Sequence, residues 1–150
     1  MATTYTNLLY HIVFSTKHRE PLITKGLQAE LYKYIGGIVR DEGGSLKKNG
    51  GMPDHVHLVV RFKANDSISH LMQRIKGNSS KWVNDHVDQK TKFAWQKGYA
   101  AFSVSESQLP VVLKYVQGQG EHHQERSFKD EFLALLRKHK IEFDERYVWD

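Results

Sequence analysis

Apolar positions recur along the chain with two periods, and these periods divide it into strands and helices. Alternating apolar residues predict half-buried strands, and apolar residues three or four positions apart predict amphipathic helices. We expect strands over residues 5–15, 45–48, 54–62 and 98–104, with a turn at Gly50–Pro53 between the second and third. We expect helices over 25–41, 68–83, 107–124 and 128–139, the first two capped by Thr24 and Ser67 and the third with Pro110 in its first turn. The order β-α-β-β-α-β, followed by two helices, is typical of a ferredoxin-like α+β fold, an antiparallel sheet with helices on one face. We expect the other face to stay open.

The third strand carries the most informative polar residues. Side chains two positions apart on a strand share a face, so His55 and His57 stand side by side, about 6.6 Å apart along the strand. Val56 and Leu58 point the other way and are expected in the core. Two imidazoles on a polar face form part of a metal site with open positions. Histidines on strands also serve packing and hydrogen bonding, so this pair alone does not decide the matter.

The predicted third helix carries two polar side chains beside its apolar stripe. Tyr115 and Gln119 are four residues apart, which places them about 6 Å apart along the helix axis and on nearly one side. A tyrosine hydroxyl can act as a nucleophile, but its ordinary pKa of about 10 requires help from a base or a metal. A glutamine carbonyl is a hard oxygen donor that suits Mg²⁺ or Mn²⁺. Taken alone, Tyr115 and Gln119 would be interpreted as an ordinary tyrosine at the boundary of the core and a solvated amide. Taken together with the two histidines, they fit metal-assisted phosphodiester chemistry.

The composition excludes some classes of protein but does not by itself identify the function. The 150 residues are expected to form one domain, residues 1–150. The absence of cysteine excludes disulfides, thiolate metal sites and cysteine nucleophiles. No apolar run approaches the roughly 20 residues that span a bilayer, so we expect a cytoplasmic protein with no membrane partner. A net charge of +5 permits nucleic-acid binding but does not demand it.

Short segments spread over nearly the whole chain carry more information together than any of them does alone. They are Tyr10–Lys17, Pro53–Leu58, Ile75–Ser80, Trp95–Ser105, Tyr115–Gln119 and His122–His123. In this combination and order the chain resembles the single-tyrosine HUH transposases, named for two histidines around a hydrophobic residue. That family includes the small insertion-sequence transposases and the REP-associated tyrosine transposases.

The resemblance implies an enzyme that cuts single-stranded DNA at sites placed by hairpins and rejoins it through a 5′-phosphotyrosine. It implies that His55, His57 and Gln119 bind the Mg²⁺ or Mn²⁺ ion and that Tyr115 is the nucleophile. Members of the family are homodimers, in which the tyrosine helix of one subunit often completes the histidine site of the other. The same assembly is therefore expected here.

One departure from the family pattern concerns the end of the tyrosine helix. Gly118 and Gly120 flank the glutamine, where the family often has a bulkier polar residue before it. Each glycine costs a helix roughly 1 kcal/mol relative to alanine. We therefore expect this helix end to be loose.

Two other functions remain open. The sheet could hold single-stranded nucleic acid without cutting it, although paired aromatics on adjacent central strands are not evident. A metal phosphodiesterase that uses water would need the histidines but not Tyr115. All three functions need phosphate contacts, and basic side chains are the candidates, although many such charges are merely solvated. On basic character alone the candidates are Lys17, Arg19, Arg74, Lys76 and Lys81.

Overall fold

The fold is known from a computed structural model that describes residues 3–87, 91–120 and 126–149. The strands in this part of the chain are β1 (Leu8–Ser15), β2 (Ser45–Met52), β3 (His55–Phe62) and β4 (Ala100–Val104). The α-helices are α1 (Lys25–Asp41), α2 (Ile68–His86), α3 (Leu109–Gln117) and α5 (Phe128–Lys138), and 3₁₀ turns cover Lys17–Arg19 and Glu106–Gln108. Within the described residues, no helix is both long and apolar enough to cross a bilayer.

The four strands form one antiparallel sheet with the order β2-β3-β1-β4. The two central strands are β1 and β3, and their register pairs Ser15 with His55 and Val13 with His57. The α+β class and the ferredoxin-like arrangement are thereby confirmed. β2 is longer than the pattern indicated, because Gly50 and Gly51 continue the strand and the turn falls at Pro53–Asp54 instead.

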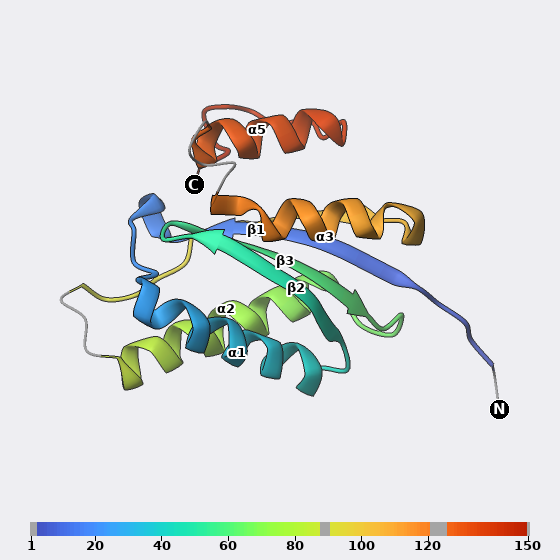
Figure 1. Cartoon of the computed structure of the whole chain (residues 1–150), viewed down its shortest axis with the longest axis horizontal. Coiled ribbons are helices and arrows are strands. Elements are labelled where there is room, and N and C mark those ends of the chain that lie inside the picture. The colour runs from blue at the N-terminus through green and yellow to red at the C-terminus, as the bar shows by residue number, and fades with distance from the viewer. Residues whose placement is uncertain (1–2, 88–90, 121–125, 150) are drawn as a thin grey trace.

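One face of the sheet packs on α1 and α2, which lie below it in Figure 1. Both helices begin where a hydroxyl cap was expected: the Thr24 side chain accepts a hydrogen bond from Leu27 N, and the Ser67 side chain accepts one from His70 N. The core side of β3 is fully buried, as its alternation indicated. The core lies between the sheet and these two helices and includes Ile12, Phe14, Leu31, Ile35, Val56, Leu58, Val60, Leu71 and Ile75.

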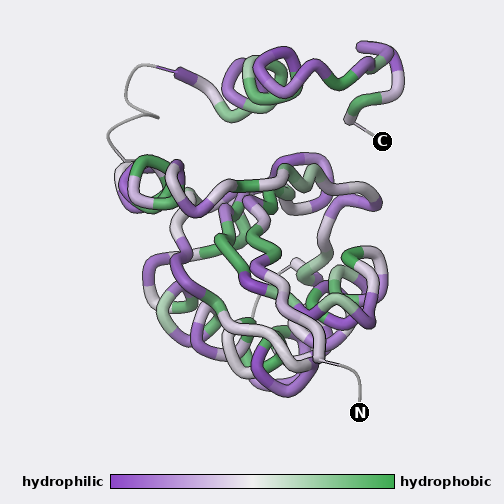
Figure 2. Tube along the Cα trace, turned by 90° about the vertical axis from the view of Figure 1, so that its right-hand side faces the viewer, coloured by the Kyte–Doolittle hydropathy of each residue, from purple (hydrophilic) through white to green (hydrophobic). Residues whose placement is uncertain are grey.

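The second face of the sheet is also covered, so the expectation of an open face is wrong. In Figure 1, α3 and α5 lie above the sheet, and in Figure 2 the C-terminal segment runs along one side of the body. Phe128, Phe132 and Leu136 of α5 pack with Val13 and Phe102 in a second cluster of buried apolar residues. The physical reason is that Val13, Val59 and Phe102 give this face apolar surface, which has to be removed from water.

Helix α3 lies against β2 and β3 and is shorter than the predicted 107–124 helix. A 3₁₀ turn precedes it, Pro110 occupies its first turn as expected, and Gly118 ends it. Gln119 and Gly120 resume a helical conformation after this break. The predicted end at Gln124 lies outside the described residues, as do His122 and His123.

Candidate active site

The polar residues of β3, α3 and α5 meet at one buried point on the second face of the sheet. The Glu131 Oε1 atom lies 3.0 Å from His57 Nε2 and 3.5 Å from His55 Nε2. The Gln119 Oε1 atom lies 3.1 Å from His55 Nε2. None of these four side chains is more than 1% exposed. The structure thus brings the predicted residues His55, His57 and Gln119 together, and adds Glu131.

Both histidine rings are held so that their Nε2 atoms face Glu131. The Nδ1 atom of His55 lies 2.7 Å from Asp54 Oδ1, and the Nδ1 atom of His57 lies 2.8 Å from His11 Nε2. A partner on the far nitrogen fixes the ring orientation and the tautomer that a metal-binding histidine needs. The ring of His55 also stacks on Phe128, with 4.1 Å between centroids. The geometry therefore resembles a prepared ligand pair more than two packing histidines.

Glu131 is the residue that the sequence interpretation missed. Burial by itself raises the pKa of its carboxyl group, but the hydrogen bonds with His57, Tyr115 and Gln119 outweigh burial and bring it below its usual value. A signal for it was present, because the inward stripe of α5 runs Phe128, Glu131, Phe132, Leu135, and a glutamate inside an apolar stripe needs polar partners. Those partners come from other elements and could not be named in advance.

Tyr115 lies at the edge of the same cluster. Its hydroxyl donates a hydrogen bond to Glu131 Oε2, and the same oxygen accepts a bond of 3.0 Å from Gln119 Nε2. Burial, and then the Glu131 carboxylate, raise the pKa of Tyr115 above its usual value. The tyrosine and the glutamine therefore converge on one carboxylate, although the break at Gly118 means that they do not share one continuous helix.

His11 is the second residue whose role was missed. It lies on β1 opposite Val59 and projects to the same face as the histidine pair, which its place in the alternation already indicated. Its ring stacks on that of His57 with 5.1 Å between centroids. Burial, and then the nearby His57, lower the pKa of His11 to about 3, so it is neutral near pH 7 and can either donate to or accept from His57.

The donor set fits a divalent metal ion. One ligand atom each from His55, His57 and Glu131 lies within 4.8 Å of the others, so a small movement would let all three bind one ion. Two imidazole nitrogens with one carboxylate form the type of set that binds Mn²⁺ and similar divalent ions, and a carboxylate with an amide oxygen also suits Mg²⁺. Gln119 can supply that amide oxygen, because its Oε1 atom already faces His55.

The predicted phosphate contacts are scattered, and four of the five already have partners. Arg19 lies over the ring of Trp149, near the C-terminus, and Lys17 is exposed in the 3₁₀ turn after β1. Lys76 turns its amino group toward the carbonyl oxygens of residues 96, 97 and 98, at 2.8, 3.1 and 2.6 Å. Lys81 pairs with Asp85 at 2.7 Å. As phosphate ligands these residues, with Arg74, stay predictions.

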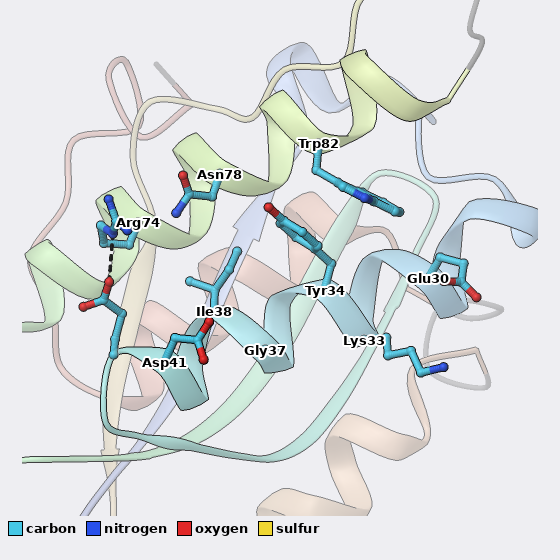
Figure 3. Close-up of a pocket in the computed structure, with 10 residues that line it drawn as sticks. Glu30, Lys33, Tyr34, Gly37, Ile38, Asp41, Arg74, Asn78 and Trp82 are labelled. Carbon is cyan, nitrogen blue, oxygen red and sulfur yellow. Dashed lines mark hydrogen bonds and ion pairs between the residues drawn. The ribbon is translucent and has the colours of Figure 1, made fainter.

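A pocket lies between α1 and α2, on the opposite face of the sheet from the candidate site (Figure 3). Its volume is about 420 Å³, and Tyr34 and Trp82 stack in it with 5.0 Å between centroids. Arg74 lines it and pairs with Glu42 at 2.8 Å, the dashed contact in Figure 3. Because its charges are mixed and the sheet separates it from Tyr115, we do not assign it to the site.

The chain is similar in sequence to known transposases. The model of the family described as "Transposase IS200 like" matches residues 4–119. The ISDra2 transposase TnpA of Deinococcus radiodurans is 26% identical over 117 residues, covering 75% of this chain and 84% of that protein. The transposase for insertion sequence element IS200 of Salmonella typhimurium is 26% identical over 120 residues, covering 74% and 76%.

Two solved structures share the fold. A putative transposase from Deinococcus radiodurans superposes with a TM-score of 0.64 at 23% identity, covering 79% of this chain and 95% of that one. A REP-associated tyrosine transposase bound to a REP hairpin gives a TM-score of 0.57 at 17% identity, covering 77% and 68%. The family match ends at Gln119, so it does not include α5 or Glu131. Since it nevertheless spans most of the 150 residues, the chain belongs to the IS200-like transposase family.

Proposed function

We propose that this transposase cuts single-stranded DNA with the hydroxyl of Tyr115 and keeps the 5′ end as a phosphotyrosine until the strand is rejoined. The observation that carries the proposal is the meeting of Tyr115 with His55, His57 and Gln119 around the single carboxylate of Glu131. A nucleophile beside a prepared set of metal ligands is what in-line attack on a phosphodiester needs.

His55, His57, Glu131 and Gln119 would hold Mg²⁺ or Mn²⁺, which when bound offsets the negative charge that grows on the scissile phosphate. The protein's own part is positioning: Asp54 and His11 fix the two imidazoles through their far nitrogens. Glu131 Oε2 accepts the hydrogen bond of the Tyr115 hydroxyl and orients the oxygen that attacks.

The covalent step balances without an external energy source. The bond from Tyr115 Oη to phosphorus forms as the bond from phosphorus to the 3′ oxygen breaks. The proton that the Tyr115 hydroxyl loses is balanced by the proton that the departing 3′ oxygen takes up to become a free 3′-hydroxyl. Attack by a 3′-hydroxyl on the phosphotyrosine reverses the step and restores the tyrosine. Cutting and rejoining therefore need no nucleotide triphosphate.

The expected partners follow from the same proposal. The neighbour of known structure is described as bound to a REP hairpin, and we infer by likeness that hairpins place the cut here too. We also expect a homodimer acting on DNA in the cytoplasm. Within one chain, Tyr115 and Gln119 already reach His55, His57 and Glu131, so the proposal favours a site built in one subunit. Exchange of the tyrosine helix between subunits is the alternative assembly.

A gel shift under denaturing conditions tests the proposal against the two other functions. Single-stranded DNA that contains a hairpin and is labelled at its 3′ end, the end of the fragment that stays on the tyrosine, is incubated with wild-type protein and Mn²⁺, and with the matched variant Tyr115→Phe. We expect a labelled covalent complex with the wild type and none with the variant or with excess chelator, whereas a native gel should show DNA binding in all three samples. Cleavage that persists in Tyr115→Phe would show a hydrolase that uses water, and binding without any cleavage would show a binding module.

A further inference from the structure

A cavity of about 550 Å³ lies beside Tyr115, between the end of β4, α3 and α5. We propose that it is a binding site for one nucleotide of the DNA strand, the nucleotide adjoining the scissile phosphate. The inference rests on the proposed function, because it takes Tyr115 as the nucleophile. It adds a contact with a base and sugar that the metal cluster does not provide.

A substrate can reach the nucleophile, Tyr115, through this cavity. Tyr115, His11 and Glu131 line it, so its inner wall is the outer edge of the candidate active site. The predicted metal ligands His55, His57 and Gln119 are buried and do not line it. A phosphate set at the Tyr115 hydroxyl from this side would leave its neighbouring nucleoside inside the cavity.

The walls suit a nucleoside. Val112, Ala134 and Leu135 give apolar surface on two facing helices, against which a base can lie flat. Ser103 and Gln108 offer hydroxyl and amide groups at the β4 side, which can hydrogen-bond the edge of a base or the sugar. The volume falls within the range of about 300–1,000 Å³ that holds small ligands in proteins.

The charges around the cavity favour a phosphate. Arg126 and Lys138 line it and are both exposed, so their cationic groups are available at its rim. Among the described residues that line it, the only acidic one is Glu131, which is buried and already hydrogen-bonded to Tyr115, Gln119 and His57. Opposite charge at the rim with apolar surface inside is the complement of a nucleotide.

Nuclear magnetic resonance of the whole protein tests this inference without cleavage. The probes are deoxyadenosine monophosphate, thymidine monophosphate and inorganic phosphate, and the readouts are the methyl signals of Val111, Val112 and Leu135, which line the cavity. We expect both nucleotides to shift these signals at millimolar concentration and inorganic phosphate to leave them in place. Nucleotides that leave the three residues unmoved would overturn the inference, as would methyl signals that change only with protein concentration, which would indicate a second copy as the occupant.

Two pairs of variants sharpen the test. Ala134→Leu fills the cavity and should weaken nucleotide binding about tenfold or more, whereas Ala134→Ser keeps its size and should not. Lys138→Gln should weaken binding of the monophosphates but not of deoxyadenosine, and Lys140→Gln, which removes the same charge outside the cavity, should change neither. Equal binding by both members of each pair would contradict the inference.

The two proposals fail separately. If the tyrosine adduct forms but no nucleotide binds in the cavity, the inference is wrong and the proposed function stands. If nucleotides bind there but no adduct forms, the cavity is a nucleotide site and the proposed function is wrong.

Discussion

Gly50 on β2 should control the position of the nucleophile, although it lies in a strand and carries no functional group. A Cβ atom added to this glycine would lie 3.0 Å from the carbonyl carbon of Val116 and 3.2 Å from its Cγ1 atom, with the carbonyl oxygen closer than any real Cβ contact. Because Val116 is buried and its contact is backbone, no flexible side chain can give way. Gly50→Ala must therefore push α3 away from the sheet by about 1 Å, and Tyr115 directly precedes Val116 in that helix.

The expected cost has two parts. Overpacking of this kind destabilises a protein by about 1–3 kcal/mol, which chemical denaturation measures. A displacement of about 1 Å at a reacting group can reduce the rate of the step about 100-fold, which the rate of adduct formation measures. The matched control is Gly77→Ala on α2, where nothing lies within 4 Å, and alanine should stabilise the helix by about 0.5–1 kcal/mol with no change in rate. Normal stability and rate in Gly50→Ala would refute the packing of α3 on β2 described above.

Other expectations concern the buried cluster. Because burial lowers the pKa of His11 to about 3, the unfolded chain binds more protons than the folded one between about pH 6.5 and 3, and stability falls as the pH falls through that window. We therefore compare the free energy of unfolding of His11→Asn and wild type at several pH values, with chelator present to keep metal out of the site. The slope of this free energy with pH should be smaller in the variant by up to about 1.4 kcal/mol per pH unit, and an equal slope in urea titrations would contradict this. Glu131→Gln should weaken Mn²⁺ binding by about tenfold or more in calorimetry, and equal affinity would remove Glu131 from the ligand set. Verified heterodimers of Tyr115→Phe and His57→Ala should stay inactive if the site lies within one chain, and recovered cleavage would show exchange of the tyrosine helix.

Most of β1, α1, β2, β3, α2 and β4 could be predicted, because hydrophobic periodicity and helix capping determine where such strands and helices form. The alternation along β3 separated Val56 and Leu58 from His55 and His57, and the hydroxyl of Thr24 marked the start of α1. These features depend on residues within a few positions of each other, where strand and helix periods act directly.

The second face of the sheet depends on contacts between distant segments, and that is where prediction failed. Nothing near Glu131 in the sequence shows that residues 74 and 16 positions earlier, His57 and Tyr115, will supply its partners. The apolar stripe of α5 indicated a buried face, but not that Phe128 would lie on His55 and close the face that was expected to be open. Sequence periodicity identifies which side of an element is buried, whereas the partner it is buried against is a property of the whole fold.

The most direct test of the central claim is to locate the covalent bond. Wild-type protein is allowed to react with a single-stranded substrate and Mn²⁺, digested with protease and nuclease, and analysed by tandem mass spectrometry. We expect a nucleotide phosphate on the peptide that contains Tyr115, and on no other tyrosine. A phosphate on Tyr99, Tyr147 or any residue outside α3 would contradict the assignment of the nucleophile and the site built around it.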